Sequence, residues 1–388
     1  MDQGKIPIVR DEDGSLISLL GSIPFSYHLD NKSLIRFLRT IISERAIEIR
    51  DKEITKVNLS DDHIVTSLEA DDGSQHKFDL YIDCSGFRSK ILGQTLQTEF
   101  LSFNKTLINN KALTFELPKS AVIDPFTSVI TMKNGWCWKI PMREENHYGY
   151  VFSTQFCSEA EALAEVQQRF GQVRHKLVDF KTGRHKTAWN GNVFALGNAY
   201  GFVEPLESTA IQTAVHSIMT LCKLMPNSLK DYSSIAGINQ EIAATWDTFR
   251  WFLGMHYKFN KKLDTPYWKW CAENTEIGDA ALIIDLFLQR PPLSASHFGT
   301  LSPYTALEAL VFNSYSYDTL IYGQKLLKEP TAPKMSRAEY FGRVEVYNNL
   351  TESSLSQNEL FDGDHLANDG LLEMLFSEQD TWINETEV

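Results

Sequence analysis

The chain has 388 residues and a formal net charge of -13, with 43% hydrophobic and 22% charged residues. This length allows a large core and two domains, and the composition is ordinary for a globular protein. The negative charge argues against nucleic acid or an anionic membrane as the main partner. No stretch approaches the roughly 20 apolar residues of a membrane span, and the N-terminus lacks the apolar core of a signal peptide. We therefore expect a soluble cytoplasmic protein.

The five cysteines are scattered along the chain and form no CxxC pair. They are Cys84, Cys137, Cys157, Cys222 and Cys271. This pattern is typical of reduced thiols and argues against a disulfide framework or a zinc site. We expect no bound metal.

The N-terminal half predicts one helix followed by a β-region. Residues 1–20 are polar and predict a loop. Apolar residues at helical spacing then run to Ile42, and Asp30 or Asn31 is suited to cap that helix. Short strands are predicted at 46–49, 54–59, 64–68 and 78–82.

The rest of the chain changes from strands to helices. Strand-like runs occupy 105–155, and Ser158 with Glu161 forms a capping box for the next helix. After Gly201 the pattern is mostly helical to about residue 325. From Thr351 onward the chain has ten acidic residues and no Lys or Arg, which predicts a flexible tail.

The segment Gly201–Ala210, GFVEPLESTA, is the most informative part of the chain. It follows a short apolar run and the glycine turn Gly197-Asn198, and it precedes a helical pattern. A strand, a glycine loop and a helix N-terminus can together bind an anion or a cofactor, because the first amides of a helix have no internal partner.

Two interpretations of this segment stay open. In the first it is an ordinary helix start, with Ser208 or Thr209 as cap and Glu204 or Glu207 complementing the helix dipole. In the second, the amides near Thr209 and Ala210 hold a small anion, and Glu207 handles a proton or an electrophile.

The segment GWCWKIP places Trp136 and Trp138 on one face of a predicted strand. Core packing or an interface is one interpretation of the paired indoles. A wall between two compartments of an active site is the other.

A strand ending in a turn of small residues is predicted before Gly86 and Arg88. Such a turn can approach a cofactor closely, and the arginine can contact a phosphate, although a plain strand-to-helix turn explains it equally well. His28 is interpreted as a histidine with ordinary hydrogen-bond partners.

An aromatic-rich stretch of the helical region predicts either core packing or a pocket for a flat ligand. It comprises Trp246, Phe249, Trp251, Phe252, His256, Tyr257, Phe259, Tyr267, Trp268 and Trp270.

Taken together, these segments resemble the flavin-dependent tryptophan halogenase family. The similar segments are SYHLDNKSLIRFL, DLYIDCSGFRSKIL, GWCWKIP, GNAYGFVEPLESTA and HYKFNKKLDTPYWKWC. GWCWKIP matches the WxWxIP signature that separates these halogenases from other flavin monooxygenases. GFVEPLESTA resembles the family's GFxEPLESTG loop.

The resemblance implies an α/β, flavin-monooxygenase-like FAD-binding fold, N-terminally incomplete, with a mostly helical C-terminal substrate region. We expect a partial FAD-binding domain with a β-sheet substrate portion at 1–220, a helical substrate-site region at 221–330 and an acidic flexible tail at 331–388. The implied chemistry uses reduced FAD from a separate flavin reductase, oxygen, and chloride or bromide to halogenate an aromatic small molecule, typically an indole. A homodimer is a further expectation.

Carried over by position, Glu207 matches the catalytic glutamate, and Thr209 with Ala210 matches the chloride-binding pair. The resemblance makes Trp136 and Trp138 the indoles that keep the substrate away from the flavin. Ala210 replaces a glycine, and a positive φ there would cost about 1 kcal/mol or more. The expected cofactor-binding residues are Gly86, Arg88, Gly197, Asn198, Gly201 and Ile211.

The sequence departs from the family at its N-terminal side. It contains no GxGxxG fingerprint and no lysine in the family's catalytic context, so no catalytic lysine is assigned. We therefore expect weak FAD binding and little halogenation by the chain alone. An FAD-dependent monooxygenase of the same fold and a non-catalytic degenerate fragment are the alternatives. No substrate-contacting residue is assigned in 296–325.

Overall fold

The computed structural model of the protein describes residues 3–11, 13–19, 26–289, 293, 312–326 and 336–362. The strands are β1 (Lys5–Arg10), β2 (Leu16–Ser18), β3 (Ile54–Leu59), β4 (Val65–Ala70), β5 (Gln75–His76), β6 (Tyr81–Asp83), β7 (Phe100–Ser102), β8 (Lys111–Pro118), β9 (Ser128–Met132), β10 (Gly135–Pro141), β11 (Glu145–Phe152), β12 (His175–Asp179), β13 (Gly183–His185), β14 (Trp189–Asn190), β15 (Val193–Ala195), β16 (Gly201–Phe202) and β17 (Ser354–Ser356). The helices are α1 (Asn31–Glu44), α2 (Glu159–Phe170), α3 (Ala210–Leu224), α4 (Tyr232–Lys258), α5 (Pro266–Asn274), α6 (Ala280–Gln289), α8 (Ser314–Gly323), α9 (Arg337–Ser353) and α10 (Gln357–Asp362). Short helical turns are η2 (Gly86–Arg88), η3 (Lys90–Thr95), η4 (Gly197–Ala199) and η5 (Pro205–Glu207).

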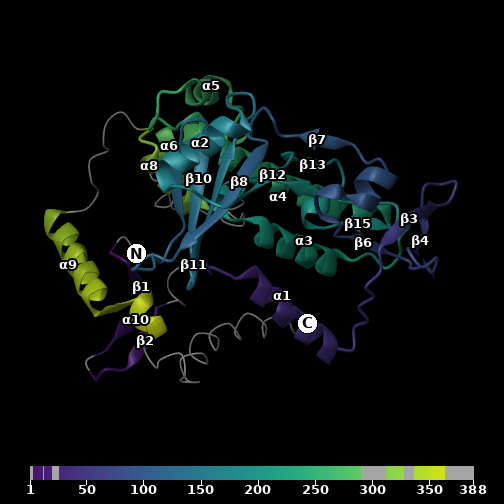
Figure 1. Cartoon of the computed structure of the whole chain (residues 1–388), viewed down its shortest axis with the longest axis horizontal. Coiled ribbons are helices and arrows are strands. Elements are labelled where there is room, and N and C mark those ends of the chain that lie inside the picture. The colour runs from purple at the N-terminus through teal and green to yellow at the C-terminus, as the bar shows by residue number, and fades with distance from the viewer. Residues whose placement is uncertain are drawn as a thin grey trace.

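A five-stranded antiparallel sheet, in the order β12-β8-β11-β10-β9, separates two parts of the core (Figure 1). Because side chains alternate along a strand, neighbouring residues of β10 enter different clusters. Trp136 packs into the large cluster that contains α4, whereas Cys137 packs into a smaller cluster with Ala162 and Val166 of α2. The predicted capping box of α2, between Ser158 and Glu161, is confirmed.

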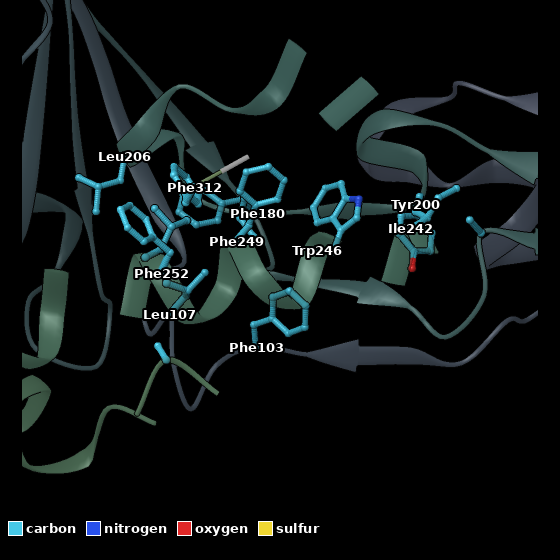
Figure 2. Close-up of a cluster of buried hydrophobic side chains, with 14 of the residues drawn as sticks. Phe103, Leu107, Phe180, Tyr200, Leu206, Ile242, Trp246, Phe249, Phe252 and Phe312 are labelled. Carbon is cyan, nitrogen blue, oxygen red and sulfur yellow. The ribbon is translucent and has the colours of Figure 1, made fainter. Parts of the chain in front are cut away.

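Helix α4 is the centre of the large cluster. Its side chains Ile242, Trp246, Phe249 and Phe252 recur every three to four residues and line one side of the helix (Figure 2). The ring of Phe252 stacks on that of Phe312 with centroids 3.8 Å apart. Most of the predicted aromatic-rich stretch is therefore core, as the first of its two interpretations held.

The two glycine turns, at Gly86 and Gly197, each follow one strand of a parallel pair. Strand β6 pairs with β15 in the register Asp83 to Ala195, and β14 completes this sheet. The buried carboxylate of Asp83 accepts hydrogen bonds of 2.9 Å from the backbone N–H groups of Ile91 and Leu92, which fixes the turn after β6. Both glycine turns thus leave the carboxyl ends of adjacent parallel strands.

The two ends of the described chain meet in a small sheet. Strand β1 lies between β2 and β17, and Ile6 and Ile8 pack against Leu355 and Leu360 (Figure 1). The prediction of a loop over residues 1–20 is wrong, since two strands occur there. Part of the expected flexible tail, 336–362, forms α9, β17 and α10, and residues 363–388 lie outside the described part.

Two predicted helices form, but their apolar faces are exposed. Asp30 caps α1, as predicted, yet no residue of α1 is buried. On α3 the buried residues are Thr213, Ser217, Thr220 and Leu221, whereas the predicted apolar face is exposed. Of the residues predicted at helical spacing, Ile211, Val215, Ile218 and Cys222 are exposed, and Met219 is exposed beside them.

The predicted strand at 46–49 is wrong, because these residues form no strand and Ala46 has a positive φ of 53°. The strand at 54–59 is confirmed by β3, and β4 overlaps most of the strand predicted at 64–68. Of the strand predicted at 78–82, only residues 81 and 82 belong to a strand, β6. None of the helices in the described ranges combines the length and apolarity needed to cross a membrane.

Candidate active site

A tight turn connects β16 to α3 and carries Glu207. After η5, Ser208 adopts a left-handed conformation with φ 54°, and α3 begins at Ala210 with Thr209 in the N-cap position. Positive φ therefore falls on Ser208, and Ala210 lies inside the helix. The strain considered for an alanine at position 210 does not arise.

The N-terminus of α3 has no side-chain cap. The Thr209 side chain makes no capping hydrogen bond, although the residue is buried, and Ser208 lies one position earlier. The first backbone N–H groups of a helix have no partner within it and carry the positive end of its dipole. This geometry leaves the backbone amides of Thr209 and Ala210 suited to an anion.

Glu207 is held by a histidine of α4. Its Oε1 lies 2.8 Å from Nε2 of His256, and the two side chains are 36% and 20% exposed. The other imidazole nitrogen, Nδ1, lies 3.3 Å from the carbonyl oxygen of Phe252. A carbonyl oxygen only accepts, so Nδ1 can donate to it, and Nε2 is then the atom that can take a proton from the Glu207 carboxyl or return one. The pair can hold or release a proton at Glu207.

Trp136 and Trp138 lie side by side on β10, with ring centroids 5.8 Å apart. Trp136 is 2% exposed, so its indole is part of the core. Trp138 is partly buried, and its ring covers the backbone of Gly149, its partner on β11. The structure places both indoles on the α4 side of the sheet.

A buried polar network that the sequence did not reveal lies between Trp136 and the turn. Glu204 is fully buried, and its Oε2 accepts hydrogen bonds from Asn109 Nδ2 at 2.9 Å, Trp136 Nε1 at 3.0 Å and the hydroxyl of Tyr257. Tyr267 donates to Asn109 Oδ1 at 3.0 Å. Burial raises the pKa of Glu204, and these hydrogen bonds oppose the increase. In the sequence, the only sign of this network was Glu204, the first glutamate of the segment EPLE.

The expected cofactor residues gather at the ends of β6 and β15. Gly86 and Gly197 have positive φ of 67° and 59°, and a Cβ on either would meet nothing within 4 Å. Turn η2 contacts η4, and η4 contacts α3, so Arg88, Asn198 and Ile211 belong to the same exposed region. Backbone without side chains at the carboxyl ends of parallel strands allows a planar ligand to approach closely.

Gly201 is separate from this exposed set. It is buried in β16, where a Cβ would lie 2.8 Å from the carbonyl oxygen of Gly183 and 2.9 Å from Cβ of Arg184. Its lack of a side chain is explained by strand packing, so the structure gives no support to a cofactor contact at this glycine.

His28 has ordinary partners, as interpreted from the sequence. Its Nδ1 lies 3.0 Å from the carbonyl oxygen of Pro141, and its Nε2 lies 3.1 Å from the hydroxyl of Thr127. Burial lowers its pKa. In the region 296–325, where no substrate-contacting residue was assigned, residues 296–311 lie outside the described part of the chain.

One group of potential metal ligands lies on β8 and β11. Glu116, Glu145 and His147 each offer a ligand atom within 4.8 Å of the others. His147 Nε2 is 3.2 Å from Glu145 Oε1, a distance typical of a surface ion pair when the imidazole is protonated. These strands carry none of the predicted halide or cofactor residues.

Comparison with known proteins identifies close relatives of this chain. The sequence profile of the tryptophan halogenase family matches residues 1–340. Tryptophan 7-halogenase RebH from Lentzea aerocolonigenes is 32% identical over 279 residues, which are 68% of this chain and 52% of RebH. Tryptophan 6-halogenase SttH from Streptomyces toxytricini is 34% identical over 257 residues, 63% of this chain and 48% of SttH. The chain thus spans about half the length of the curated relatives it matches.

Solved structures agree with this assignment of the fold. The crystal structure of MibH, a lanthipeptide tryptophan 5-halogenase, superposes with a TM-score of 0.88 at 35% identity, covering 96% of this chain and 72% of MibH. The crystal structure of SttH from Streptomyces toxytricini gives a TM-score of 0.81 at 27% identity, covering 93% of this chain and 74% of the SttH chain. The predicted α/β, flavin-halogenase-like fold is confirmed.

Proposed function

This chain belongs to the tryptophan halogenase family, and we propose that it takes part in the flavin-dependent halogenation of an electron-rich aromatic ring. The observation that carries the proposal is the pairing of Glu207 with His256 beside the uncapped N-terminus of α3. A helix N-terminus favours a halide, and an adjacent carboxyl within hydrogen-bond distance of an imidazole can serve the reaction at the ring.

The residues around Gly86 and Gly197 fit FAD. Their open, left-handed backbone at the ends of β6 and β15 supports a contact surface for the flavin, with Arg88, Asn198 and Ile211 at its border. Reduced FAD, supplied by a separate flavin reductase, would provide two of the four electrons that reduce oxygen, and the halide would provide the other two and so become an electrophilic halogen. The backbone amides of Thr209 and Ala210 hold the halide.

Glu207 acts on the substrate side. When the halogen bonds to a ring carbon, that carbon loses a proton, and the Glu207 carboxylate accepts it. His256 Nε2 then shares the proton, because it lies 2.8 Å from the carboxylate. Trp136 and Trp138 separate the aromatic substrate from the flavin, which favours halogenation over oxygenation.

The substrate we propose carries an indole. RebH and SttH are named as tryptophan halogenases and MibH as a lanthipeptide tryptophan halogenase, so the indole of tryptophan is the common chemical group. Tryptophan and indole are therefore the first compounds to test.

We also propose that FAD binding uses a further polypeptide segment. Among the described strands β6 lies at the edge of its sheet, and the nearby helix α3 exposes Ile211, Val215, Ile218 and Met219. An open parallel edge beside an apolar helix face is the usual place for an additional strand and helix.

The test is the mass of the product formed from tryptophan or indole with reduced FAD, oxygen and bromide. The chain is assayed alone and with the separately expressed N-terminal portion of a family member. A brominated product that disappears in Glu207→Gln, but persists in the exposed control Glu273→Gln, supports the proposal. An oxygenated product, or no brominated product from the folded chain in either arm, contradicts it.

A further inference from the structure

Two carboxyl groups of one short turn are held by two consecutive residues of α4. Glu207 contacts His256, and Glu204 accepts a hydrogen bond from Tyr257. Consecutive side chains on a helix point about 100° apart, so the turn is fixed in two directions rather than one. Leu206, between the two glutamates, is buried in the core near Phe252 (Figure 2).

The hydrogen bonds of Glu204 also include one from Trp136 on strand β10. Trp136 Nε1 lies 3.0 Å from Glu204 Oε2 and 2.7 Å from the hydroxyl of Tyr257. An indole N–H only donates, so the carboxyl and the hydroxyl together supply its acceptors. The orientation of the Trp136 ring is thereby tied to the turn that carries Glu207.

The network is anchored from two further elements. Asn109 donates to Glu204 Oε2 at 2.9 Å and accepts from the hydroxyl of Tyr267 on α5 at 3.0 Å. Glu204 has no exposed surface, and a buried donor left without a partner is destabilising because water cannot replace the lost acceptor. Movement of the turn would therefore disrupt several buried hydrogen bonds at once.

We propose that Glu204 is a positioning residue that fixes the Trp136 indole and the Glu207 turn relative to each other through Tyr257 and Asn109. This inference rests on the proposed function, since it is the halogenation site whose parts are held. Glu204 acts through Trp136 and Glu207 and does not itself touch the halide or the substrate. A leucine at this position would fill much of the space but would supply no acceptor.

The experiment records the indole N–H and backbone amide signals of the uniformly 15N-labelled chain. The chain has eight tryptophans, and Trp136→Phe identifies the signal of interest. Glu204→Leu and Tyr257→Phe are expected to shift that signal and the backbone amide signals of 207–210. Glu204→Gln, which keeps an acceptor oxygen, is expected to restore most of the wild-type positions. Tyr232→Phe, at a 76% exposed tyrosine of the same helix, is the control and should shift neither.

Unchanged Trp136 and 207–210 signals in folded Tyr257→Phe would overturn the inference, and this variant decides the matter if Glu204→Leu does not fold. Equal shifts in Glu204→Gln and Glu204→Leu would also overturn it. These signals need no flavin, halide or turnover. Failure of the proposed function, an absent brominated product with the network intact, is therefore distinguishable from failure of this inference.

Discussion

Nε2 of His256 lies 2.8 Å from Oε1 of Glu207, and this contact joins α4 to the turn at the N-terminus of α3. Nδ1 of the same imidazole faces the carbonyl oxygen of Phe252, so the ring is oriented by its own helix. A carboxyl group within hydrogen-bond distance of an oriented imidazole, next to open helix amides, is suited to reactions that release a proton near an anion.

The proposed proton transfer from Glu207 to His256 predicts different effects for substitutions of these two residues. Glu207→Gln should lower kcat for halogenation by about 100-fold or more, because loss of a general base typically costs that much. His256→Gln can still donate to Glu207 but cannot carry the proton, so its kcat should fall by less. Steady-state kinetics with varied halide checks this. A kcat for Glu207→Gln within about twofold of the wild type would exclude the assigned role.

The buried carboxyl of Glu204 predicts a pH-dependent stability. Burial raises its pKa above the ordinary value of 4.5, so the folded state binds this proton more tightly than the unfolded state does. The free energy of unfolding of the wild type should therefore decrease, relative to Glu204→Gln, as the pH rises above about 4.5. Chemical denaturation of both proteins over a series of pH values measures the difference. A difference that is constant or grows with pH would contradict the raised pKa.

The ring of Trp138 lies over Gly149, so replacing this glycine should lower the stability of the protein. A Cβ at Gly149 would lie 1.9 Å from Cζ2 of Trp138, so Gly149→Ala must displace the indole. We expect a loss of about 1–3 kcal/mol in the free energy of unfolding and a shifted Trp138 indole signal. Gly237→Ala on α4 is the control, because nothing lies within 4 Å of its Cβ and alanine favours a helix. Equal stability of the two variants would show that the ring does not lie over Gly149.

The orientation of α3 predicts which of its apolar residues stabilise the chain. Leu221 is 8% exposed, and Leu221→Ala should cost about 2–5 kcal/mol. Ile218, three residues earlier, is 43% exposed, and Ile218→Ala should change the free energy of unfolding by at most about 0.5 kcal/mol. Thermal or chemical unfolding of the two variants compares the two positions directly. A larger loss for Ile218→Ala would mean that α3 is turned the other way.

Local patterns predicted the parts of this fold that depend on neighbouring residues. The cap at Asp30 and the capping box at Ser158 follow from hydrogen bonds within one turn, so the sequence was sufficient to place them. Periodicity predicted α3 but not its orientation, since Ile218 is exposed and Leu221 is buried. Strand β1 was missed because its neighbouring partner β2 has only three residues and its other partner, β17, lies more than 300 residues away.

The candidate site was predicted by motif rather than by geometry. Glu207, Thr209 and the two tryptophans were found because they occur in characteristic segments. Asn109 was not named, and Tyr257 was named only as part of the aromatic-rich stretch, because both meet Glu204 through tertiary packing between residues that are far apart in the chain. Gly201 looked like a cofactor glycine, whereas strand packing explains it.

Binding of a halide at the N-terminus of α3 is the central claim, and titration of the 15N-labelled chain with sodium bromide tests it most directly. Sodium gluconate at equal ionic strength is the reference. The account predicts saturable shifts of the Thr209 and Ala210 backbone amide signals that are specific to bromide. Shifts that are equal with gluconate, or confined to residues away from this turn, would contradict it.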